Sequence, residues 1–426
     1  MKKGCVVAEL HKLQLHLLQS REKKYPYLAV LLYRGMPIAC QAPLAHAWHT
    51  VHHLLDALRR LCKAPAALGG AAEQASQRRE MLLQSLGVEL FACWLAPFWF
   101  VLQPLLGSGR PLLFTIVADR LEQLLLPWEI LCWPETPCSA LDSVVIWRRT
   151  LGVVWSPWAA GNKEADLWAQ SMAPRLTEPA PQALPGEWPG ELRLLIAVAR
   201  PSGFATRVEE SALCRLQQML QANPALHCCW LMAATRQQLR EQIDHFAPQV
   251  VCLLGAALLQ GEQGFFVFEE ADGSAEVRSA AEVMQEIAPS GSVHLLLLLG
   301  REEGHPPAVA AMAALSRGVV AQGLPWALLV PASVEDPGVD LFLTVFLQQL
   351  VEGASVEHSL LRARHSASAA GQGVLCPTWI LPVLFGGTTL STSQCDDQHA
   401  SVTPLKALST TVCFDERMDC SSACQS

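Results

Sequence analysis

The chain has 426 residues, of which 51% are hydrophobic and 16% are charged, enough apolar material for a large core built as two domains or one elaborated domain. Its formal net charge is -8 and it has no cluster of Lys and Arg, which argues against a nucleic-acid surface. The amino terminus is not expected to be a signal peptide because Glu9 interrupts its apolar run, and the fifteen cysteines are expected to be reduced thiols. These features predict a cytoplasmic protein.

Residues 1–154 are predicted to form a first unit of α+β type. Its expected strands alternate apolar and polar residues or are short apolar runs, and its expected helix has apolar residues at helical spacing. The strands are expected at 13–19, 27–40, 111–119 and 143–155, and the helix at 45–64.

One apolar segment, 88–106, is as long as a membrane span of about 20 residues. It contains Glu89, Gln103, Pro97 and Pro104, a set that a spanning helix rarely carries. We therefore predict a buried helix broken at Pro97 and no membrane partner. A membrane-associated adaptor is the alternative reading.

Two segments differ in composition from the rest. Residues 155–190 contain six prolines and are predicted to be a linker or a long surface loop. Residues 388–426 are polar and rich in Ser and Thr, and are predicted to be a disordered tail.

Between these segments, residues 191–387 alternate buried strands with amphipathic helices. Strands are expected at 192–199, 227–234, 249–256, 293–300, 326–332 and 379–385, with a hairpin at 264–277 turning at Asp272-Gly273. The helices are expected at 208–222, 235–246, 279–287 and 307–319, followed by two more that end at Ala369. This alternation predicts a parallel sheet with helices on both faces.

Five phrases in this order resemble the CHAT family, caspase-like peptidases of the separase and caspase clan. They are "LLLPWEILCWP" (124–134), "PQVVCLLGAALLQGEQGFFVFEEADG" (248–273), "SVHLLLLLGREEG" (292–304), the segment 314–364, and "PTWILPVLF" (377–385). The resemblance implies a caspase-like three-layer α/β sandwich with a mostly parallel sheet, preceded by a packed α+β unit.

In this family a His and a Cys at the tips of neighbouring strands form a catalytic dyad. The imidazole lowers the pKa of the thiol, and both groups must lie where a peptide can reach them. On the family's pattern, Ala256 of Gly255-Ala256-Ala257 stands in the place of the His, and Arg301 in the place of the Cys. Alanine cannot accept a proton and a protonated guanidinium has no lone pair for attack.

Relocated chemistry is the rival interpretation. No His lies between His245 and His294, and no Cys between Cys252 and Cys376, so a shift of register does not restore the dyad. Exchanged roles for Cys252 and His294 are disfavoured, because a rise of about 3.3 Å per residue leaves them roughly 13 and 20 Å below the tips. An active cysteine peptidase that uses Cys376 or His305 stays open.

Candidate metal sites are weak. His49, His53 and Asp56 share one helical face, but a third strong ligand is lacking, and the tail cysteines Cys413, Cys420 and Cys424 lack CxxC spacing. Cys228 and Cys229 face opposite sides of a strand, which suits core packing. Trp128 is expected to anchor the first unit against the caspase-like sheet, with Glu129 capping a helix or pairing with an arginine. No metal or cofactor is predicted.

The sequence therefore predicts a catalytically inactive CHAT homologue that acts by binding. Its binding rim comprises Gly255, Ala257, Arg301, Glu302 and Glu303, whose charges suit a protein tail or another subunit. By resemblance, clan members serve in bacterial signalling and defence assemblies. The expected partner is another protein, with an active peptidase or an effector complex as candidates.

Overall fold

The computed structural model describes thirteen stretches of the chain, all within one compact unit, Met1–Thr389; a second unit is Leu390–Ser426. The described residues are 11–19, 27–33, 36–41, 49–57, 70–107, 112–118, 120–131, 144–150, 191–204, 210–300, 306–331, 337–370 and 382–386. The predicted linker at 155–190 and the predicted tail at 388–426 lie outside these residues.

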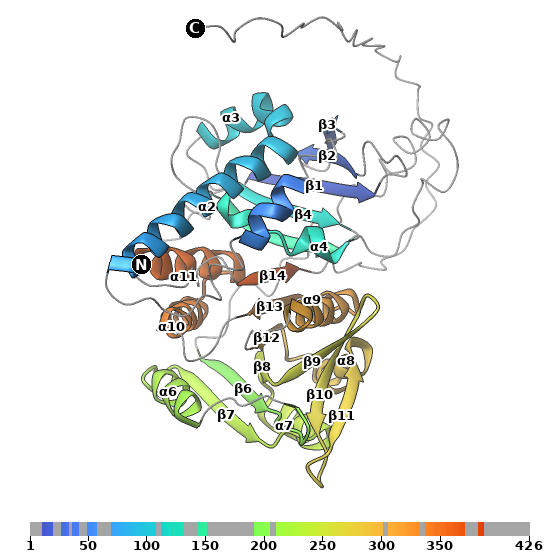
Figure 1. Cartoon of the computed structure of the whole chain (residues 1–426). Helices are drawn as coiled ribbons and strands as arrows, with labels where there is room; N and C mark the ends of the chain where they lie inside the picture. The colour runs from blue at the N-terminus through green and yellow to red at the C-terminus, as the bar shows by residue number, and fades with distance from the viewer. Residues whose placement is uncertain are drawn as a thin grey trace, which may run out of the picture. The chain divides into compact units, whose positions relative to one another are not determined.

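One eleven-stranded sheet, in the order β3-β2-β1-β4-β5-β14-β13-β12-β8-β6-β7, runs through the described part of the chain (Figure 1). Its amino-terminal strands are β1 (His11–Gln19), β2 (Tyr27–Tyr33), β3 (Met36–Gln41), β4 (Leu112–Ala118) and β5 (Val144–Thr150). The others are β6 (Leu192–Val198), β7 (Leu226–Met232), β8 (Val250–Leu254), β12 (Leu295–Leu299), β13 (Trp326–Val330) and β14 (Val383–Gly386).

The caspase-like part confirms the predicted mixed α/β architecture with a mostly parallel sheet. Strands β7, β6, β8, β12 and β13 are parallel neighbours, and β14 closes this part in the antiparallel direction. Every residue of β8, β12 and β13 is buried, because a parallel strand is covered on both faces. This burial explains why these strands are continuous apolar runs in the sequence.

Helices cover both faces of this part, giving three layers (Figure 1). One face carries α6 (Glu210–Gln221), α10 (Pro337–Val351) and α11 (Val356–Ala370), and the other carries α7 (Arg236–Phe246), α8 (Ala280–Ile287) and α9 (Pro306–Ala321). Alternate strand residues serve the two faces: Leu253 and Leu298 belong to the α7–α9 side, and Cys252 and Leu297 to the other.

A small antiparallel sheet, β11-β10-β9, packs on the α9 side. Its strands are β9 (Ala256–Gln260), β10 (Gln263–Glu269) and β11 (Ala275–Ser279). The predicted hairpin is confirmed, but its turn has three residues rather than two, because Glu270 donates its N–H to the carbonyl of Ser274 and Gly273 adopts a φ of 81°. Strand β9 was not predicted, since the family pattern suggested a loop there.

The amino-terminal helices pack against the first strands. They are the helical segment 49–57, α2 (Gly70–Trp94), η1 (Ala96–Phe98), α3 (Trp99–Gly107), α4 (Leu121–Leu124) and η2 (Trp128–Ile130). The predicted break near Pro97 is confirmed, because η1 separates α2 from α3. No single described helix is long and apolar enough to cross a membrane; Met81–Trp94 and Ala96–Leu105 meet those criteria only together, with a 62° bend between them.

The first unit and the caspase-like part share the sheet. Strand β5 pairs in parallel with β14, so the sheet continues across the predicted division between the parts. The side chain of Arg120 also joins them, since it donates to Gln19 of β1 and pairs with Glu262 of the β9–β10 turn. The carbonyl of Glu262 in turn accepts a hydrogen bond from Arg317 of α9.

Candidate functional site

The tips of β8 and β12 are adjacent at the carboxyl-terminal edge of the parallel strands, which we call the mouth. The two strands pair in register, with Leu254 opposite Leu299, so Gly255 and Gly300 are the next residues on the two tips. Ala256 follows Gly255 and Arg301 follows Gly300 in the sequence. Open α/β sheets bind ligands at this edge.

Side chains pack closely around both glycines at the mouth. A Cβ on Gly255 would lie 2.8 Å from the ring of Phe266, and a Cβ on Gly300 would lie 2.3 Å from the sulfur of Met312. Any side chain at these positions would require Phe266 or the flexible end of Met312 to move. In this sequence, the first residues with side chains after the two tips are Ala256 and Arg301.

Ala256 is the first residue of β9, where it pairs with Val267 of β10, and Ala257 pairs with Phe266. Both alanines are half-buried. The predicted loop at Gly255-Ala256-Ala257 is thus a bend that leads directly into a strand. Three other residues predicted for the binding rim, Arg301, Glu302 and Glu303, lie outside the described residues, as do His305 and Cys376.

A third strand tip reaches the mouth beside β8. The N–H of Ala199, just past β6, donates to the carbonyl of Leu254 at 2.9 Å, which holds the next residue, Arg200, beside Gly255. The N–H of Arg200 donates to the Glu269 carboxylate at 3.2 Å. Its Nε and Nη2 atoms are buried and have no hydrogen-bond partner among the described residues.

Sequence reasoning did not select Arg200. An arginine next to a strand end is ordinarily a solvated residue, and the burial of its nitrogens depends on the tertiary structure. The available signal was its position: "AVARP" places Arg200 directly after a buried strand and before Pro201, at the edge where ligands bind.

The thiols of the described core are poorly suited to nucleophilic attack. Burial raises the pKa of Cys252, and it raises that of Cys93 to about 12 and that of Cys228 to about 11. A high pKa keeps these groups protonated, whereas the thiolate is the nucleophile. Burial also lowers the pKa of His294, and the backbone N–H of His294 bonds to Gln249 at the opposite end of the strands from the mouth.

Other candidate groups do not form a site in the described structure. His49, His53 and Asp56 are exposed on the helical segment 49–57, and the described residues include no group of three or more His, Cys, Asp or Glu side chains placed to hold a metal ion. Trp128 is fully buried against Trp94 of α2, with ring centroids 6.3 Å apart, so this contact lies within the first unit. The tail cysteines Cys413, Cys420 and Cys424 and the side chain of Glu129 lie outside the description.

A groove of about 370 Å³ lies between α6 and α10, away from the mouth. Residues from the end of α6, the loop before β7 and the second half of α10 line it: Met219, Leu220, Ala222, Asn223, Pro224, Leu226, Thr344, Leu347, Gln348, Val351 and Glu352. The loop that follows α6 leads to the amino end of β7, so this groove belongs to the opposite edge of the sheet from the strand tips.

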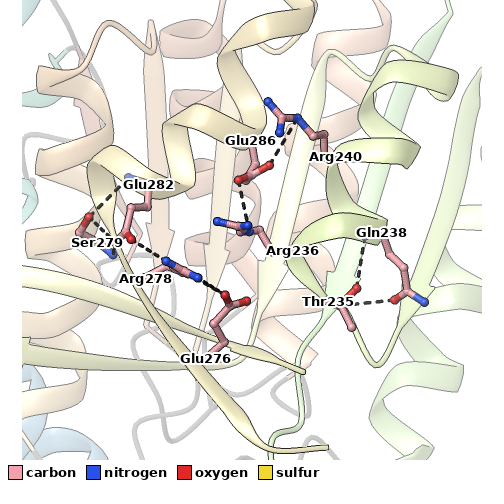
Figure 2. Close-up of polar contacts among 9 residues, drawn as sticks. All are labelled: Thr235, Arg236, Gln238, Arg240, Glu276, Arg278, Ser279, Glu282 and Glu286. Atoms are coloured by element: carbon pink, nitrogen blue, oxygen red, sulfur yellow. Dashed lines mark hydrogen bonds and ion pairs between the residues drawn. The ribbon is translucent and has the colours of Figure 1, made fainter. Parts of the chain in front are cut away.

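Arginines on the α7–α8 side contrast with Arg200, because each has a carboxylate partner (Figure 2). Arg236 and Arg240 of α7 flank Glu286 of α8 at 3.5 and 3.6 Å. Arg278 of β11 pairs with Glu276 and, at 2.7 Å, with Glu282. The carboxylates compensate the charges of these arginines, of which Arg278 is half-buried and Arg236 and Arg240 have more exposed side chains.

Comparison with known families agrees with this architecture. A model of the CHAT domain matches residues 101–381, which include the tips of β6, β8 and β12. No curated protein matches the chain. The family match covers well over half of the sequence and coincides with the caspase-like sheet and the last strands and helices of the first unit, so the chain belongs to the CHAT domain family.

Proposed function

We propose that this protein is a catalytically inactive member of the CHAT family that works by binding another protein. The observation that carries the proposal is the register of β8 and β12, whose neighbouring tips lead to Ala256 and Arg301. The family's chemistry needs an imidazole and a thiol at these two positions. Neither residue can take either role, because a methyl group moves no proton and a guanidinium stays protonated.

The position of Cys252 argues against its use as a substitute nucleophile. Cys252 is three positions beneath Gly255 on β8, is almost fully buried, and has a pKa raised by burial. A peptide bond at the mouth cannot reach a thiol inside the strand layer. This supports loss of peptidase activity over exchange of roles between Cys252 and His294.

Binding is the function that an inactive mouth retains. Arg301, Glu302 and Glu303 supply charge at the position of the family's nucleophile loop, and such charges favour recognition of a complementary protein segment. We propose a regulatory or scaffold subunit, partnered by an active peptidase or an effector complex. Its place in a bacterial signalling or defence assembly follows from the resemblance alone.

The proposal is tested by incubating the purified full chain with a library of peptides made by digesting a proteome. Mass spectrometry should find no cleavage beyond that in the blank. The double variant Ala256→His with Arg301→Cys restores both groups to neighbouring tips and should cleave peptides, while each single variant should not.

The rival, a peptidase with relocated groups, makes a different prediction. Cleavage by the unmodified chain that is lost in Cys376→Ala or His305→Ala would establish that rival and refute the proposed loss of activity. A matched Cys214→Ala variant serves as the control, because Cys214 is an exposed thiol of α6.

A further inference from the structure

Arg200 is held at the mouth by backbone hydrogen bonds on both sides of it. The N–H of Ala199 is bound to Leu254, that of Arg200 to Glu269, and that of Ser202 to Gly273 at 2.8 Å. The residue therefore occupies a defined place beside Gly255. Strand β8 lies between it and the tip of β12, which leads to Arg301. Its position is set by the fold and does not require contacts of its side chain.

The guanidinium of Arg200 is incompletely satisfied in the free protein. Nε and Nη2 are buried without a hydrogen-bond partner among the described residues, although the side chain as a whole is only half-buried. A guanidinium stays charged at any physiological pH, so it cannot relieve this cost by losing its proton. Buried donors that lack partners destabilise a protein, and charged donors do so more than neutral ones.

The nearest described carboxylate does not remove this cost. Glu269 accepts the backbone N–H of Arg200, and no ion pair joins its carboxylate to the guanidinium within the described structure. In contrast, Arg278 and the pair Arg236 and Arg240 all have carboxylate partners within 4.0 Å. Arg364 of α11 also has a buried Nε without a hydrogen-bond partner, but its Nη2 donates to the carbonyl of Pro382, whereas both Nε and Nη2 of Arg200 lack a partner among the described residues. Stability of the free chain does not explain Arg200.

We propose that Arg200 binds a carboxylate of an extended segment of the protein partner at the mouth, an inference that rests on the proposed binding function. A guanidinium presents a planar fork of N–H donors that a carboxylate accepts in bidentate fashion. Arg200 is half-buried and lies just past the tip of β6, so a ligand at the strand tips lies within the reach of a long arginine side chain. The ligand then supplies the acceptors that the free protein lacks.

The experiment uses three fluorescein-labelled pools of octapeptides, degenerate except at one central position and at the carboxyl end. The first pool has a central Glu and an amidated end, the second a central Gln and a free carboxylate, and the third a central Gln and an amidated end. Fluorescence polarisation with the full chain should show about tenfold tighter binding of the first or second pool than of the third. Comparing the affinities of the first and second pools shows whether the bound carboxylate belongs to a side chain or to the carboxyl terminus of the peptide.

Two arginines at opposite ends of β6, Arg193 within the strand and Arg200 just past it, provide the matched variants. Arg200→Met should abolish the preference for a carboxylate, whereas Arg193→Met should preserve it, because Arg193 is an exposed residue at the amino end of β6. Equal binding of the three pools, or a preference that survives Arg200→Met, would overturn the proposal.

Thermal unfolding distinguishes a ligand site from a structural role. Because the guanidinium lacks a partner in the free protein, Arg200→Met should leave the Tm unchanged or raise it. A fall of several degrees would mean that a partner within the chain already binds Arg200, and the proposal would be wrong. Peptide cleavage by the unmodified chain would refute the proposed inactivity and leave an Arg200-dependent preference standing, so the two failures are distinguishable.

Discussion

The layers that support the mouth, namely the buried strands and the α7–α8 side of the sheet, differ from the mouth itself in how completely their polar groups are satisfied. Strands β8 and β12 are fully buried, α7 and α8 begin with capping boxes, and Arg236, Arg240 and Arg278 have carboxylate partners (Figure 2). At the mouth, Arg200 has buried nitrogens without a partner in the described structure, and the tip of β8 leads to Ala256, where the family resemblance implies a histidine.

This difference separates the groups that stabilise the folded chain from a group that does not. Apolar burial, helix caps and paired charges all lower the free energy of the folded chain, so stability accounts for the supporting layers. An unpartnered guanidinium does not lower it, which directs attention to a ligand.

Strand β10 and helix α9 pack closely at Gly264, where a side chain would meet the backbone of the helix. A Cβ on Gly264 would lie 2.2 Å from the backbone nitrogen of Leu315 and 2.3 Å from the carbonyl oxygen of Ala311. Backbone atoms of a helix cannot move aside alone, so Gly264→Ala should lower the free energy of unfolding by about 3 kcal/mol or more. Urea unfolding followed by circular dichroism measures this loss.

Gly261, in the turn before β10, provides the comparison. Its added Cβ would meet no atom within 4 Å, but its φ is +61°. Gly261→Ala should therefore cost only about 1–2 kcal/mol, the penalty of a left-handed backbone for alanine. Equal losses for the two variants would show that the packing of β10 on α9 is looser than described here.

The capping box of α8 gives a smaller effect that depends on pH. At the start of α8, Ser279 and Glu282 cap each other, and the pKa of Glu282 is lowered to about 2 by hydrogen bonds from the Ser279 N–H and hydroxyl and from Arg278. A carboxyl with a depressed pKa adds stability above its ordinary pKa of 4.5 and loses it as the pH falls toward 2. Ser279→Ala should cost about 1 kcal/mol at neutral pH, and this cost should shrink between pH 4.5 and 2.

Thr235 is the uncharged counterpart at the start of α7. Its hydroxyl accepts the N–H of Gln238 at 3.2 Å, and the Gln238 side chain accepts the N–H of Thr235. Thr235→Ala should also cost about 1 kcal/mol, but with no change between pH 4.5 and 2, because glutamine does not titrate. A cost of Ser279→Ala that does not vary with pH would argue against a bound, ionised Glu282.

Most of the caspase-like part was predictable because its strands are covered on both faces. Runs such as Leu295–Leu299 can only be buried, and the helices between them carry apolar residues at helical spacing, as Leu213, Leu216 and Leu220 do on α6. Strand β9 was missed because Ala256–Gln260 has no strong pattern of its own and depends on pairing with β10. The pairing of β5 with β14 likewise depends on the tertiary structure, because the two strands are far apart in the sequence.

The site was predictable only in part. The family pattern places Ala256 and Arg301, and the register of Leu254 with Leu299 puts their strand tips side by side. Arg200 could not be found in the same way, because no local pattern signals whether the nitrogens of an arginine are covered or paired. Trp128 shows the same limit: the sequence predicted that it anchors the first unit against the caspase-like sheet, and the structure places its ring against Trp94 of the first unit.

Labelling with a thiol-reactive peptide probe tests the central claim, that no cysteine and histidine cooperate at the mouth, most directly. The full chain is treated with a peptidyl acyloxymethyl ketone at pH 7.5, and the modified cysteine is located by mass spectrometry. We predict that no cysteine reacts faster than the exposed Cys214, and that unfolding is needed to label Cys252. Rapid labelling of a single cysteine in the folded chain, abolished by replacing one histidine, would contradict the account.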